Sequence, residues 1–192
     1  MGDIGGSSSI IDVDHTFQGD RGISHAELNW PTRLKVIQGI ARGMDYLASE
    51  FSSYELPHGN LKSSNILLAS NFEPLLADYA FYPLINNHPR GSITLRLQIT
   101  RGHSTPAQIL TGKFPSQYLN NQKGGTDIVQ WVRSAVSENR ESGLIDPEIA
   151  VARDSLGQMV RLLQIGAACT ESDHDRRIDM REAIRRVEEI QV

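Results

Sequence analysis

The chain contains a polar segment, His58-Gly59-Asn60-Leu61-Lys62-Ser63-Ser64-Asn65, that leads directly into two short apolar runs. The runs are Ile66-Leu67-Leu68 and Pro74-Leu75-Leu76-Ala77, and the turn-like residues 70–73 separate them. Short apolar runs joined by turn residues are typical of a small β-hairpin. Asp78-Tyr79-Ala80 follows at once, with Asp78 lying 13 positions after Asn65. The sequence therefore predicts a hairpin flanked at both ends by polar loops.

Most of the remaining pattern is helical. Apolar residues recur at helical spacing over 30–50, 127–138, 155–170 and 179–190. Asn29 and Asp179 are residues of the kind that cap helix N-termini. Gly39 and Gly43 lie one turn apart in the first helix, which indicates either close packing by another element or a slightly weak helix. The order helix, hairpin, irregular middle and further helices predicts a mainly α (α+β) fold.

Composition narrows the class of protein. The 192 residues fit one domain with an extension. Residues 1–23 are rich in Gly and Ser, so we expect a flexible leader before a domain over 24–192. A charged fraction of 22% with a net charge of −4 argues against a nucleic-acid partner. The single cysteine, Cys169, excludes an internal disulfide framework, and no apolar run approaches the roughly 18 residues that cross a bilayer.

For the other reactive residues we prefer structural or solvent-exposed roles over catalytic or metal-binding ones. His58 lacks a serine or cysteine nucleophile motif, which favours a structural role. Cys169 lies beside an apolar run, which favours a buried, inert thiol. Asp12, Asp14 and His15 could suggest a metal site, but their place in the leader favours solvated charge.

Residues 58–65 together with 78–80 resemble the catalytic loop and metal-binding motif of eukaryotic protein kinases, H-R-D-L-K-x-x-N followed by D-F-G. In that family the loop Asp accepts the substrate hydroxyl proton, and the Asn and D-F-G Asp hold magnesium against the ATP phosphates. The resemblance implies that Lys62 would lie near the transferred phosphoryl group. It also implies that Asn65 and Asp78 would hold the family's cofactors, ATP and magnesium, although in this chain we expect that binding to be weak or absent.

The wider sequence is similar to the plant leucine-rich-repeat receptor-like kinases, and most similar to the pollen receptor-like subgroup. The matching stretches include Leu28-Asn29-Trp30-Pro31-Thr32-Arg33-Leu34, 37–47, Ala168-Cys169-Thr170 and Met180-Arg181-Glu182-Ala183. In the family all of these belong to the C-terminal lobe of the kinase domain. The resemblance implies a cytoplasmic location, as part of plasma-membrane receptors, with other receptor-like kinases or signalling proteins as partners.

Departures from the family pattern bear on function. Asn60 occupies the position of the catalytic base, and loss of a positioned general base costs about 10²- to 10⁴-fold in rate. Gly59 replaces the Arg that pairs with an activation-loop phosphate in many kinases. Ala80 replaces the D-F-G glycine and restricts the backbone there. These replacements predict that phosphoryl transfer by the family's route is impaired.

Some family features have no match in the 192 residues, among them the Gly-rich phosphate loop and the third-strand Lys. We expect residues 83–108 to be an atypical insert that replaces the activation segment and the central helix. Within it Ile93, Leu95, Leu97 and Ile99 alternate with polar residues, which is typical of a half-buried strand. A basic phosphate-binding ribbon, an exposed edge strand and a disordered insert all remain open.

The lack of a matching partner for Arg177 is relevant to the stability of the domain. In the family it pairs with a glutamate of the A-P-E motif, but residues 79–126 contain no Asp or Glu. We therefore expect Arg177 either to stay in water or to destabilise the domain. Loss of the central helix would leave the helices around Met44, Trp131 and Leu163 facing a gap. The sequence thus predicts a marginal or partly molten fold.

Three functions remain open at this point. The chain could be a catalytically inactive, pseudokinase-like C-lobe that binds signalling proteins. It could be a serine/threonine protein kinase that transfers the ATP γ-phosphate to protein hydroxyls, although Asn60 argues against this. It could also be a truncated product without function. We rank loss of catalysis first.

Overall fold

The computed structural model describes residues 11–13, 16, 27–50, 63–77, 104–113, 128–171 and 177–192. Its main helices are α3 (Trp30–Glu50), α6 (Ser104–Thr111), α8 (Ile128–Ser137), α9 (Pro147–Ala150), α10 (Leu156–Cys169) and α11 (Met180–Glu188). Short 3-10 turns are η2 (Ser63–Asn65), η3 (Glu141–Leu144) and η4 (Arg153–Ser155), and the strands are β1 (Ile11–Asp12), β2 (Ile66–Leu68) and β3 (Pro74–Leu76). The predicted mainly α class is confirmed.

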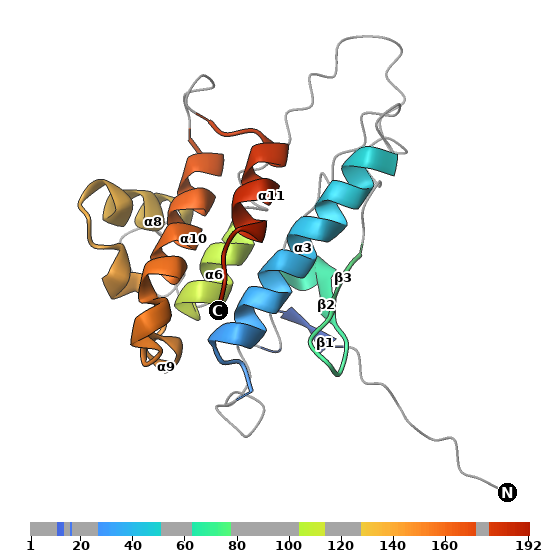
Figure 1. Ribbon diagram of the computed structural model, residues 1–192, viewed down its shortest axis with the longest axis horizontal. Coiled ribbons are helices and arrows are strands. Elements are labelled where there is room, and N and C mark those ends of the chain that lie inside the picture. The colour runs from blue at the N-terminus through green and yellow to red at the C-terminus, as the bar shows by residue number, and fades with distance from the viewer. Residues whose placement is uncertain are drawn as a thin grey trace, which may run out of the picture.

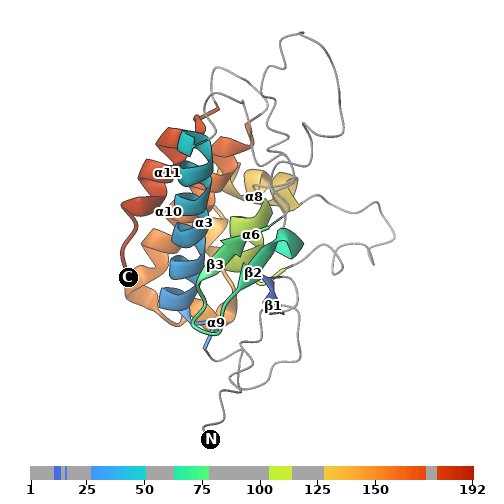
Figure 2. The same ribbon diagram turned by 90° about the vertical axis from the view of Figure 1, so that its right-hand side faces the viewer.

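The long helix α3 lies between the small sheet and the other helices (Figure 1). Asn29 Oδ1 accepts a hydrogen bond from the Thr32 backbone N–H at 3.1 Å, so the predicted capping residue does cap this helix. One face of α3 packs against α11 and α6, and α6 in turn packs against α8 and α10. Figure 2 shows α6 near the middle of the molecule, behind the strands β2 and β3. The core therefore forms around α6.

The strands form an antiparallel sheet in the order β1-β2-β3. The hairpin register pairs Ile66 with Leu76 and Leu68 with Pro74, which confirms the predicted hairpin. The leader differs from our expectation at residues 11–13. Ile11 pairs with Leu68 through β1, and the Val13 side chain is fully buried. A short strand next to one buried valine has no periodicity, so the sequence pattern did not reveal it.

Gly39 and Gly43 allow the hairpin to approach α3 closely. A Cβ atom on Gly39 would lie 2.4 Å from Pro74 Cγ, and one on Gly43 would lie 2.9 Å from Leu76 Cδ1. Of the two interpretations offered for these glycines, close packing by another element is the correct one. Because these two glycines have no side-chain carbon, β3 can pack directly against α3. This close packing fixes the hairpin against the helix.

Arg33 is a fully buried charge that joins three parts of the chain. Its Nε donates to the Leu28 carbonyl oxygen and its Nη1 to the Ile109 carbonyl oxygen, both at 2.7 Å. Its Nη2 lies 2.8 Å from Asp146 Oδ2 in an ion pair. The Asp146 backbone N–H donates to the Leu110 carbonyl oxygen at 2.9 Å. Arg33 thus ties α3 to the end of α6 and to the start of α9.

Gly112 ends α6 and leaves room for this pair. Its φ of +63° is the left-handed conformation that glycine adopts without strain at a helix C-terminus. A Cβ atom at this position would lie 2.5 Å from Asp146 Oδ2. Glycine is therefore required here both by backbone conformation and by the nearness of the Asp146 carboxylate.

The centre of the lobe differs from the expected gap. Residues 104–108, which we assigned to the insert, form the first part of α6, and Thr105, Ile109 and Leu110 are fully buried. Residues 83–103 lie outside the described residues, so the alternating stretch from Ile93 to Ile99 stays a prediction. A helix therefore occupies the centre. What remains of the gap is a cavity of about 80 Å³ between α3, α10 and α11.

The C-terminal helices match the sequence pattern closely. Asp179 caps α11, since its Oδ1 accepts from the Glu182 backbone N–H at 2.8 Å. Trp131 is partly buried against the core, and the Lys113 ammonium lies over its ring, 5.0 Å from the ring centroid. The expected destabilisation of the domain stays a prediction, but Arg177 itself does not stay wholly in water. It is half-buried, and its Nε donates to the Glu171 carbonyl oxygen at 2.7 Å. A backbone carbonyl thus takes the place of the glutamate partner.

We predict that Asp146→Ala destabilises the chain by about 3–5 kcal/mol, because it leaves the buried Arg33 charge without its carboxylate. Glu148→Gln is the matched control. Glu148 Oε2 lies 3.8 Å from Arg33 Nη2 on a side chain that is 39% exposed, so its loss should cost less than about 1 kcal/mol. Urea unfolding of both variants measures the two costs. Equal costs would contradict the role given to the buried pair.

We also predict opposite effects for alanine at two helical glycines. Gly39→Ala should destabilise by about 1–3 kcal/mol, because the new methyl group meets the rigid Pro74 ring. Gly166→Ala should stabilise by up to about 1 kcal/mol, because its methyl group meets no atom within 4 Å and alanine favours the helix. Thermal unfolding compares them, and stabilisation by Gly39→Ala would contradict the close packing of β3.

Candidate phosphate and metal site

The candidate site begins at the junction of η2 and β2. Ser63 and Asn65 in η2 are buried, with 4% and 5% of their surface exposed, whereas Ser64 is exposed. η2 also contacts β1. The turn therefore holds Asn65 inward at the start of the hairpin. An amide oxygen is a hard donor of the kind that magnesium accepts, so Asn65 fits the metal-binding role in chemistry and burial.

The hairpin brings its two ends together. The Ala77 backbone N–H donates to the Asn65 carbonyl oxygen at 2.8 Å, immediately beyond the Ile66–Leu76 pair. The residue that precedes Asp78 is thus held against Asn65. Since Asn65 and Asp78 are the two expected metal ligands, the hairpin provides the local reason for their 13-position spacing.

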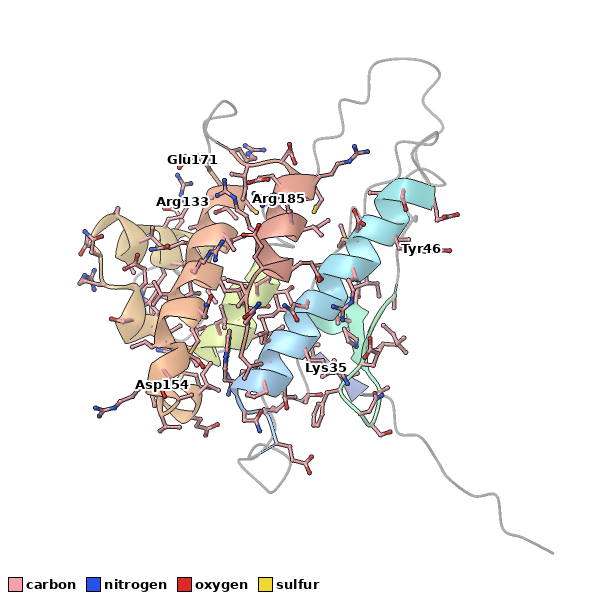
Figure 3. All side chains as sticks on the ribbon, viewed as in Figure 1. Lys35, Tyr46, Arg133, Asp154, Glu171 and Arg185 are labelled. Atoms are coloured by element: carbon pink, nitrogen blue, oxygen red, sulfur yellow. The ribbon has the colours of Figure 1, made fainter. Side chains whose placement is uncertain are left out.

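The far end of the hairpin is fixed to α3. The Phe72 backbone N–H donates to the Ala69 carbonyl oxygen at 2.8 Å, and Phe72 adopts a φ of +62° that closes the turn. Lys35 Nζ donates to the Asn71 carbonyl oxygen at 2.8 Å and lies 3.6 Å from Glu73 Oε2. Figure 3 shows Lys35 extending from α3 on the side of the hairpin. These contacts position the hairpin, and with it Asn65.

Asn65 is the one expected site residue that falls within the described residues. Asn60, Lys62 and Asp78 lie outside them, as do His58, Gly59 and Ala80. The roles of these residues, and their meeting around a nucleotide, therefore stay predictions. Asp14 and His15 also lie outside, and the part of the chain that is described contains no group of three or more His, Cys, Asp or Glu suited to a metal ion.

Cys169 has the inert character that the sequence suggested. Its side chain is buried, and it forms no disulfide. Burial raises the pKa of the Cys169 thiol to about 12, and the nearby Arg186 charge offsets only part of this. A thiol is nucleophilic as its thiolate, which is scarce near neutral pH at such a pKa. Cys169 is therefore not a candidate nucleophile.

Sequence reasoning missed the Arg33–Asp146 pair, whose only local signal was an arginine within an apolar helical stripe. The pair joins segments that are far apart in the sequence, so no local pattern could reveal it. The apolar cavity beside α10 is different, because the sequence predicted a gap there, and the structure shows a smaller one.

Comparison with known proteins supports the sequence resemblance. No protein-family model matches the chain. The chain is 52% identical to pollen receptor-like kinase 6 and 50% identical to pollen receptor-like kinase 3, both of Arabidopsis thaliana. Each alignment covers 95% of the chain, which spans only 30% and 31% of the two relatives.

A solved structure gives the fold. The pseudokinase domain of BIR2, an immune regulator of the RLK/Pelle family, superposes with a TM-score of 0.71 at 22% sequence identity. The match covers 93% of this chain and 56% of that domain. Among the residues that the structure describes, no helix is both long and apolar enough to cross a membrane. The chain is thus a homologue of part of the plant pollen receptor-like kinases, and its fold matches part of a protein kinase domain.

Proposed function

We propose that this chain is a catalytically inactive, kinase-like signalling segment. The observation that carries the proposal is Asn60 at the position of the family's catalytic base. A carboxylate can accept the proton of a substrate hydroxyl, whereas a neutral amide cannot do so at ordinary pH. The attacking oxygen would therefore keep its proton until late in the reaction. This lowers the rate even where the phosphate and metal are well placed.

Two further replacements support the same conclusion. Gly59 supplies no guanidinium to hold a phosphorylated activation loop, so that switch has no anchor at this position. Ala80 narrows the backbone conformations that follow Asp78. These changes affect proton transfer, control of the activation loop and the metal-binding motif. Their combination is better suited to a binding role than to catalysis.

A second candidate function is serine/threonine phosphoryl transfer from ATP to protein hydroxyls. Retention of Lys62, Asn65 and Asp78 favours it, because these residue types would hold phosphate and magnesium. Magnesium would neutralise charge on the phosphate oxygens when bound. The buried Asn65 and the hairpin contact at Ala77 are compatible with this role.

The surface on α8, α10 and α11 supports a binding role with other receptor-like kinases or signalling proteins in the cytoplasm. Its helices are joined across the surface by ion pairs. Arg133 Nη2 lies 2.7 Å from Glu171 Oε1, and Arg161 Nη2 lies 2.8 Å from Glu189 Oε2 (Figure 3 labels Arg133 and Glu171). Arg161 and Glu189 are exposed and Arg133 and Glu171 are half-buried, so side chains of both signs lie at this surface, which suits recognition of a partner by charge and shape.

We predict that the purified chain incorporates no phosphate from labelled ATP into itself or into a generic protein substrate above the background of an Asp78→Asn variant. The reason is that Asn60 cannot accept the hydroxyl proton. Filter-bound radioactivity, followed over hours, measures the rate. Incorporation by the unmodified chain that disappears in Asp78→Asn would overturn the proposal in favour of the kinase.

We predict, separately, that ATP with magnesium gives no saturable rise in the unfolding temperature of this chain. Asn65 and Asp78 would supply metal ligands, but these 192 residues contain no match to the Gly-rich phosphate loop. A ligand present at a hundred times its dissociation constant adds about 2.7 kcal/mol to stability, which the thermal measurement detects easily. A saturable shift that Asp78→Asn abolishes would show retained nucleotide binding, with or without catalysis.

A further inference from the structure

An apolar cavity lies where α3, α10 and α11 meet, with Pro106 of α6 also in its wall. Its volume is about 80 Å³, and it is half-enclosed rather than sealed. Met44 and Met180 contribute thioethers from α3 and α11, and Cys169 contributes its thiol from α10. Residues distant in sequence thus form one hollow in the core. The candidate phosphate site does not include any of them.

The wall of the cavity is suited to an uncharged, apolar occupant. Every residue in it is aliphatic, small or sulfur-containing, and none carries a formal charge at neutral pH. A volume of 80 Å³ exceeds the roughly 10–15 Å³ that one water needs, but an ordered water also needs two to four polar partners. This wall supplies almost none. Water is therefore a poor occupant, and sulfur atoms add favourable contacts with apolar and aromatic groups.

We propose that this cavity is a binding site for a small, uncharged, apolar molecule. Its volume is about half of the roughly 150 Å³ in an engineered cavity that binds benzene or xenon. A xenon atom fits this volume, and a benzene-sized group fits only by extending into the open side. The proposal is independent of whether Asn60 abolishes catalysis.

Occupancy would strengthen the attachment of α11. On the described residues, the polar links of α11 and its C-terminal end to α3 include the exposed Arg42–Glu188 pair at 3.4 Å and Gln38, whose Nε2 donates to the Ile190 carbonyl oxygen at 3.0 Å. An occupant would add contacts with Met44 on one side and with Met180 on the other. Binding to the folded state alone raises its stability.

Two glycines of α10 provide a matched pair of variants. Gly166 lines the cavity, and a Cβ atom placed there meets no atom within 4 Å. Gly157 also has open space around its Cβ position, but it is exposed and lies away from the cavity. Gly166→Leu should fill the cavity, whereas Gly157→Leu adds the same side chain to the same helix outside it.

The test is xenon and benzene titration of the full chain, observed through carbon-13-labelled methionine methyl groups. We expect saturable shifts for Met44 and Met180, both in the wall, and none for Met159, which is fully buried elsewhere. The Gly157→Leu variant should keep these shifts, and Gly166→Leu should lose them.

Three results would overturn the proposal. The first is the absence of saturable shifts at Met44 and Met180 with both probes. The second is an equal response at Met159, which would indicate general solvation of the core. The third is an unchanged response in a folded Gly166→Leu variant. Should that variant fail to fold, the contrast between the wall methionines and Met159 in the unmodified chain decides the matter alone.

Discussion

The buried guanidinium of Arg33 is the constraint on which the helical part of this chain depends. A charge with no exposed surface must have all its polar partners supplied by the protein. Those partners are the Leu28 and Ile109 carbonyl oxygens and the Asp146 carboxylate, which come from three separate segments. Satisfying the charge therefore fixes the end of α6 relative to α3. Once α6 is fixed, α8 and α10 have a surface to pack on.

The same helix α3 that carries Arg33 also supports the candidate site. Gly39 and Gly43 bring β3 against the helix, and Lys35 holds the far turn of the hairpin. The near end of the hairpin then places Ala77 against Asn65. The position of Asn65, the residue proposed to bind metal, is thus supported by α3 through the hairpin. The proposed loss of catalysis rests separately on Asn60, at the position of the family's catalytic base.

Local sequence signals predicted the elements whose causes are local. The α3 stripe with its Asn29 cap, the hairpin and the Asp179-capped helix were all evident from spacing and capping residues. The strand β1 and residues 104–108 of α6 were not evident from the sequence. A two-residue strand and a single turn of helix depend on contacts with distant partners. The hydrogen bond from Arg177 to the Glu171 carbonyl oxygen was also not predicted, because a contact to a backbone carbonyl leaves no pattern in the side chains. For the site, motif resemblance supplied Asn60, Lys62, Asn65 and Asp78, and the structure describes Asn65 alone.

Native-state hydrogen exchange at the Asp146 amide measures whether Arg33 couples the segments that it joins. This N–H donates to the Leu110 carbonyl oxygen, and the carboxylate of the same residue pairs with Arg33. If Arg33 joins α3, α6 and the start of α9 into one cooperative unit, the Asp146 amide should exchange with the same free energy of opening as the buried amides of α3 and α10. Exchange of the Asp146 amide through a separate, much smaller opening, while α3 and α10 stay protected, would contradict the account.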